Sequence, residues 1–169
     1  MMKRLYAAMF ATALTAAVAA PSAFAADDSK EFIEKAVRGN IAEVKLGELA
    51  EKQAKSDQVK TLGETLRTDH GKALEKSKAL AKEMDVEVKM EPTDDAKETY
   101  DELAKLSGAE FDREFVEAAV EDHEKDIELY TEQAEEGDNP KVVEYAKETL
   151  PVLKKHLDAA RKLEGNVGN

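Results

Sequence analysis

The chain of 169 residues contains no cysteine. It therefore has no disulfide bond, no thiolate metal ligand and no cysteine nucleophile. Without a Cys-x-x-Cys-His motif, covalent attachment of a c-type haem is excluded as well. A domain that lacks these supports depends on its hydrophobic core for stability.

Positive charge is scarce. The 25 Lys and Arg residues face 37 Asp and Glu residues, and the formal net charge is −12 at pH 7. Such a surface repels nucleic acid and anionic lipid, because phosphate binding requires clustered basic side chains. The chain also lacks a glycine-rich phosphate loop and a nucleophile elbow, so neither a bound nucleotide nor Ser/His/Asp catalysis is expected.

Only one long apolar run occurs, and it lies at the N-terminus. The basic start MMKR is followed by LYAAMFATALTAAVAA and by Ala23-Phe24-Ala25. These are the three parts of a Sec-type signal peptide with an A-x-A cleavage site. We expect residues 1–25 to be removed by cleavage after Ala25. The product would be a single domain of residues 26–169 with its core at about 29–163, located in the periplasm or secreted, with no membrane insertion. An uncleaved N-terminal anchor is the alternative.

The rest of the chain shows helical periodicity. Charged residues make up 37% of the sequence and aromatic residues 5%, a composition also found in disordered chains. Apolar residues nevertheless recur at spacings of three and four, which predicts amphipathic helices. The expected long helices span about 28–55, 57–84, 109–136 and 140–163, and a short helix ends at Ser107-Gly108.

Residues suited to capping helix N-termini precede each expected helix. Two of them are followed three residues later by Glu, which predicts capping boxes at Asp28 and Ser107. The capping candidates are Asp28, Ser56, Thr93, Ser107 and either Asp138 or Asn139.

The connection between the second and third long helices, residues 85–108, is longer than an up-down bundle needs. A ferritin-like crossover would use this length, and a capping excursion is the alternative. We therefore predict an all-α fold, a ferritin-like four-helix bundle with a short extra helix in the connection between helices two and three.

Each long helix carries one potential metal ligand on its apolar face: Glu43, His70, His123 and His156. Glu43 lies about 13 residues before the first tight turn and His70 about 14 after it, so at a rise of about 1.5 Å per residue both lie roughly 20 Å from that turn. His123 and His156 lie at distances from the final tight turn, at Asp138, that agree within about one helical turn. We expect the four side chains to converge at the middle of the bundle.

Three imidazoles and one carboxylate form a plausible ligand set for one divalent metal ion, with zinc, iron, copper and manganese as candidates. Asp69 and Asp122 directly precede His70 and His123, and their carboxylates would orient histidines by accepting a hydrogen bond from the ring N–H. Neighbouring residues point about 100° apart on a helix, which weakens this assignment. A metal-free, buried Glu–His hydrogen-bond network and separate core histidines are the alternatives. No Glu-x-x-His motif occurs, so a carboxylate-rich di-iron oxidase is not expected.

Two glycines flank Glu43 at a distance of four residues. Gly39 and Gly47 each cost about 1 kcal/mol relative to alanine inside a helix. We expect them to permit close helix approach or to leave room for rings beside Glu43. The acidic run EDHEKDIE is interpreted as mostly solvated helix surface.

Several segments resemble the bacterial family known as domain of unknown function 4142. They are AEVKLGELA, the TDH around His70, SGAEFDREFVEAAVEDHEKDIELY and LPVLKKHLDAAR, and the resemblance covers roughly Glu31 to Leu163. It implies export and a ferritin-like helical fold, and it implies no established activity. By resemblance, the recurrent polar positions of the family would be Glu43, His70, Asp112, His123 and His156.

The leading functional hypothesis is an exported bundle that binds one metal ion and serves in metal handling or envelope stress protection. A metal-free interaction module that binds an envelope protein is the first alternative. An oxidoreductase with an open metal position is the second, and a non-enzymatic role is preferred over it.

Overall fold

The computed structural model describes residues 25–165 and 167, with side chains from Asp28 onward. Within this part the chain forms helices and no β-strand, which confirms the all-α expectation. The helices are α1 (Ala25–Gln53), α2 (Asp57–Glu83), α3 (Asp94–Leu103), α4 (Gly108–Glu136) and α5 (Pro140–Glu164). The expected signal peptide falls almost entirely on residues 1–24, outside the described part. None of the described helices has the length and apolar character needed to cross a bilayer.

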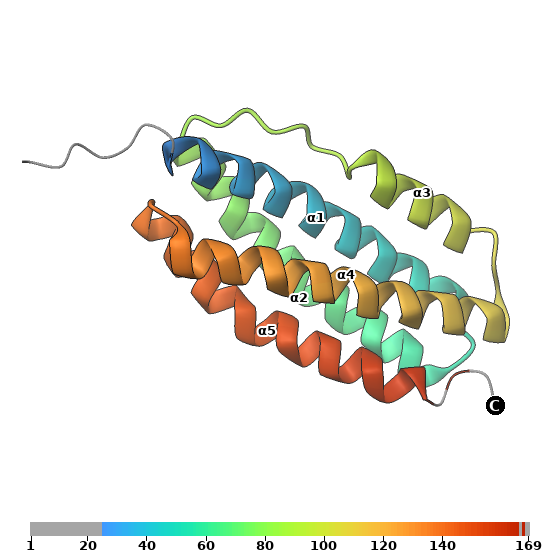
Figure 1. Cartoon of the computed structure of the whole chain (residues 1–169). Helices are drawn as coiled ribbons and strands as arrows, with labels where there is room; N and C mark the ends of the chain where they lie inside the picture. Colours follow the sequence, from blue (N-terminus) through green and yellow to red (C-terminus); the bar gives the residue numbers. More distant parts are fainter. Residues whose placement is uncertain (1–24, 166, 168–169) are drawn as a thin grey trace, which may run out of the picture.

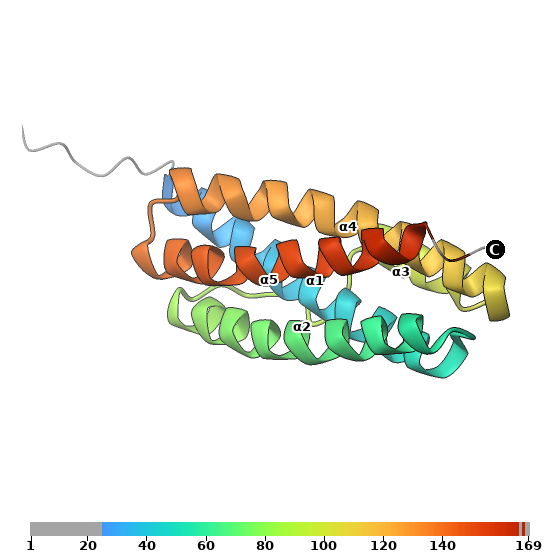
Figure 2. The same ribbon diagram turned by 90° about the horizontal axis from the view of Figure 1, so that it is seen from below.

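The four long helices form two antiparallel pairs, α1 with α2 and α4 with α5 (Figure 1). After α2 the chain returns along the bundle to the end where α1 meets α2, and α4 starts there (Figures 1 and 2). The Asp112 carboxylate fixes this arrangement by accepting hydrogen bonds from the backbone N–H groups of Lys55 at 2.9 Å and Ser56 at 2.8 Å. Helix α4 therefore runs parallel to α2, and the connection between them is a long crossover.

Most helix starts follow the expected capping chemistry. The side chains of Ser56, Thr93 and Asn139 accept hydrogen bonds from backbone N–H groups in the first turns of α2, α3 and α5. The two predicted capping boxes are wrong. Helix α1 begins at Ala25, so Asp28 lies inside it, and the Ser107 side chain caps no N–H because the chain enters α4 through a glycine with φ of +67°.

The core consists of two apolar clusters separated by a polar layer. One cluster lies toward the α1–α2 turn and the other toward the α4–α5 turn, and every long helix contributes to both. Between them, each of the four long helices places polar residues in the interior. The buried members of this layer are Asn40, Glu43, His70, His123 and His156.

Helices α1 and α2 approach closely at a glycine pair. A Cβ atom added at Gly47 would lie 2.5 Å from the Gly63 carbonyl oxygen, and one added at Gly63 would lie 2.6 Å from the Ala50 Cβ. The expectation of close approach is therefore confirmed at Gly47. It is wrong at Gly39, where an added Cβ would have no such neighbour within 4 Å.

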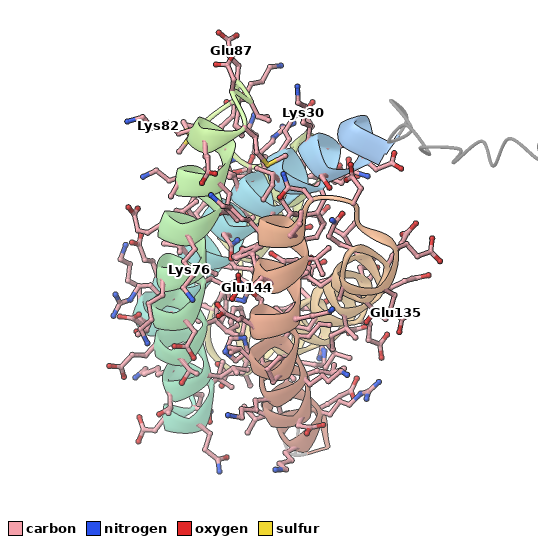
Figure 3. The ribbon with its side chains drawn as sticks, turned by 90° about the vertical axis from the view of Figure 1, so that its left-hand side faces the viewer. Lys30, Lys76, Lys82, Glu87, Glu135 and Glu144 are labelled. Carbon is pink, nitrogen blue, oxygen red and sulfur yellow. The ribbon has the colours of Figure 1, made fainter. Side chains whose placement is uncertain are left out.

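Charged side chains cover the outside of the bundle. Figure 3 shows Lys76 of α2 and Glu144 of α5 on facing sides of the seam between these helices. An ion pair of 3.0 Å between Lys76 and Glu148 crosses this seam. The α2–α5 seam is thus bridged at its surface by an ion pair.

Candidate metal centre

The structure brings the three predicted histidines together in the polar layer. The exposed fractions of His70, His123 and His156 are 3%, 0% and 3%. Nε2 of His123 lies 3.3 Å from Nε2 of His70 and 3.2 Å from Nδ1 of His156. In all three pairs the potential ligand atoms lie within 4.8 Å of one another. The cluster joins α2, α4 and α5, and thus both helical pairs.

The outer nitrogen of each ring faces an oxygen acceptor. Nδ1 of His70 lies 2.9 Å from the side-chain oxygen of Asn40, and Nδ1 of His123 lies 2.8 Å from the carbonyl oxygen of Ala119. Nε2 of His156 lies 3.4 Å from a carboxylate oxygen of Asp69. A neutral imidazole carries one N–H, and these contacts place it on Nδ1 of His70 and of His123, whereas both nitrogens of His156 face an acceptor.

The three rings are neutral at pH 7. Burial, followed by the charges of the other two histidines, lowers the pKa of His70 well below its usual value. Burial also lowers the pKa of His123. Burial and the charge of His123 lower the pKa of His156 to about 4, although Asp69 opposes this shift. Each ring therefore has one proton and one lone pair.

The inner nitrogens of the three rings face one another, and the protons of His70 and His123 are committed to their outer acceptors. Nitrogen atoms that share a zinc ion at about 2.0–2.1 Å and at the tetrahedral angle are roughly 3.3–3.4 Å apart. The observed separations of 3.2 and 3.3 Å lie close to this spacing. The chemistry of the donor set thus fits a metal ion, which would remove the repulsion among the lone pairs.

Glu43 lies in the same layer but faces a different set of groups. It is 5% exposed, and it is not in the group of ligand atoms formed by the histidines. Burial, followed by the charge of Asp122, raises the pKa of Glu43 to about 8. Burial and the charge of Glu43 raise the pKa of Asp126 to about 7. The neighbours that act on Glu43 electrostatically are therefore aspartates of α4.

The outer acceptors differ in part from the expected ones. Asp69 contacts His156 of α5 and not its sequence neighbour His70. Asp122 pairs with Lys125 at 4.0 Å, and no hydrogen bond joins it to a described histidine. Asp69 therefore accepts from a histidine of the cluster as predicted, but that histidine is His156. Helical geometry explains the change, because neighbouring residues point in different directions.

Asn40 is the main residue of the site that the sequence interpretation missed. Its amide nitrogen donates to the Ala36 carbonyl oxygen at 2.6 Å and contacts the Tyr145 hydroxyl at 3.2 Å. Tyr145 in turn contacts the hydroxyl of Tyr130 at 3.2 Å. The position three residues before Glu43 is the signal that would have identified Asn40, because this spacing places both on one helix face.

Two solved structures have the same fold. A crystal structure of a DUF305 fragment from Deinococcus radiodurans has a TM-score of 0.73 and 10% identity, and the match covers 82% of this chain and 96% of that one. A structure of CopM in the Cu(I)-bound form has a TM-score of 0.71 and 16% identity, with 83% and 98% covered. At these identities the likeness shows the fold alone.

No curated protein matches the chain in sequence. The family described as "Domain of unknown function (DUF4142)" matches residues 13–163, which include the whole helical bundle to the last turn of α5. This range also includes the three histidines and the buried polar layer. The chain therefore belongs to the family of domain of unknown function 4142.

Proposed function

We propose that this protein binds one metal ion at His70, His123 and His156 and that its role is metal handling. The observation that supports this most strongly is the convergence of one ring nitrogen from each of the three buried histidines. All three outer nitrogens face oxygen acceptors, and the inner nitrogens are 3.2 and 3.3 Å apart. Outer acceptors of this kind orient histidines that bind metals in proteins.

The donor set favours metals that bind imidazole. Three neutral nitrogen ligands suit copper and zinc, and iron is a further candidate. The structure of CopM is described as Cu(I)-bound, and this neighbour has the same fold. We therefore propose copper and zinc as the first ions to test.

Glu43 is part of the proposal as the fourth ligand. Its carboxyl would have to turn toward the imidazoles and lose its proton, because burial holds its pKa at about 8. The proposal also includes a ferritin-like arrangement of the bundle, supported by its long crossover. We further propose that the signal peptide is cleaved and that the protein is located in the bacterial envelope. Its role there would be metal handling or protection against stress.

The first experiment is metal analysis by mass spectrometry of untagged protein purified from a periplasm. The comparison is a variant in which His70, His123 and His156 are all replaced by alanine. About one equivalent of a single metal in the wild type, absent from the variant, is the expected result. Addition of Cu(I) or Zn²⁺ to metal-free wild type should raise its melting temperature, since an ion that binds only the folded state stabilises it.

The absence of metal from purified wild type, together with no thermal shift on addition of either ion, would contradict the proposal. It would favour a metal-free histidine cluster held by Asn40, Ala119 and Asp69, which corrects the expected Glu–His network because no hydrogen bond joins Glu43 to a described histidine. In that case the acidic outer surface would be the functional element, and the interaction with an envelope protein would be tested by capture of a defined partner.

A further inference from the structure

His156 differs from the other two histidines because an acceptor faces each of its ring nitrogens. Nδ1 of His156 lies 3.2 Å from Nε2 of His123, and Nε2 of His156 lies 3.4 Å from a carboxylate oxygen of Asp69. The buried ring is neutral and carries one N–H, so it can donate to only one of these two acceptors. Its proton therefore has two alternative positions inside the site.

Nε2 of His123 is an acceptor because the proton of that ring is held elsewhere. Nδ1 of His123 lies 2.8 Å from the carbonyl oxygen of Ala119, which can only accept a hydrogen bond. The side-chain oxygen of Asn40 holds the proton of His70 on Nδ1 in the same way, at 2.9 Å. Nε2 of His70 therefore has no proton to donate to His123, although the two nitrogens are 3.3 Å apart. Among the three rings, His156 alone can donate to Nε2 of His123.

Three features favour Nδ1 as the protonated nitrogen of His156 in the metal-free protein. The contact with His123 is shorter than the contact with Asp69, which at 3.4 Å exceeds the usual N–H···O range of about 2.7–3.2 Å. The other oxygen of Asp69 accepts a hydrogen bond from Lys72 at 2.8 Å, which compensates the carboxylate charge. A proton on Nδ1 also replaces the repulsion between two lone pairs by a hydrogen bond. The empty cluster is thus closed by its own histidines.

The same nitrogen is the one that His156 offers as a ligand. Nδ1 of His156 faces the Nε2 atoms of the other rings, so His156 would bind through Nδ1 and the other two through Nε2. A ligand nitrogen must be free of its proton, and a neutral ring keeps its single N–H. The proton then belongs on Nε2, where Asp69 is the acceptor.

We propose that the proton of His156 changes from Nδ1 to Nε2 when the site is filled, and that Asp69 is the positioning residue for the filled state. The inference rests on the proposed metal centre and adds to it the proton exchange by which the closed cluster becomes a ligand set. One N–H bond breaks at Nδ1 and one forms at Nε2, so the ring keeps a single proton. Solvent water carries the proton, since the side chain of Asp69 is 33% exposed.

NMR of the wild type reads the protonated nitrogen of His156 directly. The protein is labelled with ¹⁵N-histidine and studied at pH 7, first free of metal and then with one equivalent of Zn²⁺. The chemical shift of a ring nitrogen distinguishes its protonated form from its unprotonated form, and His156→Gln assigns the signals of this ring. We expect His156 to carry its proton on Nδ1 without metal and on Nε2 with zinc. His70 and His123 should carry theirs on Nδ1 in both states.

Asp69→Asn tests the positioning role, and Glu75→Gln is its matched control. Both carboxylates lie on α2 and pair with a lysine three residues later, at 2.8 Å to Lys72 and 3.0 Å to Lys78. Glu75 is exposed and Asp69 faces His156. Chelator competition should show zinc affinity lowered by about 10- to 100-fold in Asp69→Asn and unchanged in the control. The proton of His156 should stay on Nδ1 in metal-free Asp69→Asn, because the new amide N–H₂ can donate to Nε2.

A proton on Nε2 of His156 in the metal-free wild type would overturn the exchange and leave the metal centre in place. Equal zinc affinity of Asp69→Asn and Glu75→Gln would overturn the positioning role of Asp69. Thermal unfolding shows whether both variants fold, and the NMR of the wild type decides the exchange if one of them does not. Absence of zinc binding by the wild type would overturn the metal centre and the exchange together, so the two failures are distinguishable.

Discussion

The side-chain oxygen of Asn40 lies 2.9 Å from Nδ1 of His70, and it is held in that orientation by the other end of the same amide. The Asn40 nitrogen donates to Ala36 and contacts the hydroxyl of Tyr145, so the oxygen must face His70. This contact assigns the proton of His70 to Nδ1 and leaves Nε2 free to bind a metal ion. A residue of α1 thus determines which nitrogen of an α2 histidine enters the site.

Replacement of Asn40 by alanine should lower both stability and metal affinity. Loss of the buried hydrogen bonds should reduce the free energy of unfolding by about 1–3 kcal/mol. Loss of the outer acceptor of His70 should weaken metal binding by about 10- to 100-fold. Chemical denaturation and chelator competition measure the two effects.

Ser29→Ala is the control for Asn40→Ala. Ser29 is buried at the far end of α1 and donates to Asp138 at 2.7 Å. Its replacement should reduce stability and leave metal affinity unchanged. If both variants lose metal affinity to the same extent, Asn40 acts through stability alone.

The two glycines of α1 should respond to alanine in opposite ways. At Gly39 the new methyl group meets open space, so the higher helix propensity of alanine should stabilise the protein by about 0.5–1 kcal/mol. At Gly47 the methyl group would meet the Gly63 backbone, and the forced separation of α1 and α2 should cost about 1–3 kcal/mol. Urea denaturation of the two variants provides the comparison, and a stabilised Gly47→Ala would refute the close approach.

Glu43→Gln should change how the stability of the metal-free protein depends on pH. The pKa of Glu43 is raised from 4.5 in the unfolded chain to about 8 in the fold. Its contribution to stability is therefore fully present below pH 4.5 and is lost as the pH rises through about 8. The wild type should lose up to a few kcal/mol relative to the variant over this window.

Denaturation of both proteins at several pH values measures this difference. The buried histidines act in the opposite direction. Their lowered pKa values give stability that is present above about pH 6.5 and lost as the pH falls toward about 4. Because both proteins contain the histidines, their contribution cancels in the difference, and parallel pH profiles would show that the fold does not raise the pKa of Glu43.

Metal binding should release a proton if Glu43 is a ligand. At pH 7 the Glu43 carboxyl is protonated, whereas the histidines are neutral and release none. Titration calorimetry in buffers of different ionisation enthalpy should give up to about one proton per ion for the wild type and fewer for Glu43→Gln. Equal proton release from Glu43→Gln and wild type would exclude the carboxyl of Glu43 as the source, and Asp126→Asn tests the neighbouring carboxyl in the same way.

Much of the fold follows from local chemistry that a sequence displays. Ser56, Thr93 and Asn139 cap the helices they precede, because the short side-chain oxygens reach the free N–H groups of a first turn. The long crossover was expected from its length, whereas the direction of α4 was not. That direction depends on Asp112 reaching the α1–α2 turn, a contact between residues more than fifty positions apart.

The three histidines of the candidate site could be predicted from the sequence, whereas the residues around them could be predicted only in part. Three histidines on apolar faces at similar depth indicate a common location. Asn40 escaped attention because asparagine is a poor helix former and is more typical of caps and turns. Asp122 was expected to orient a histidine and Asp126 to lie on the solvated surface, but both are partly buried and act electrostatically on Glu43 of α1.

The two helical pairs divide the histidines unequally. The α1–α2 pair supplies His70, the α4–α5 pair supplies His123 and His156, and one crossover joins the pairs. A nascent chain that has completed only its first hairpin possesses a single imidazole, and a proteolytic fragment of either half has at most two. The meeting of all three rings is consequently a property of the finished molecule, and a bound ion would fasten together two halves that the polypeptide itself links only once.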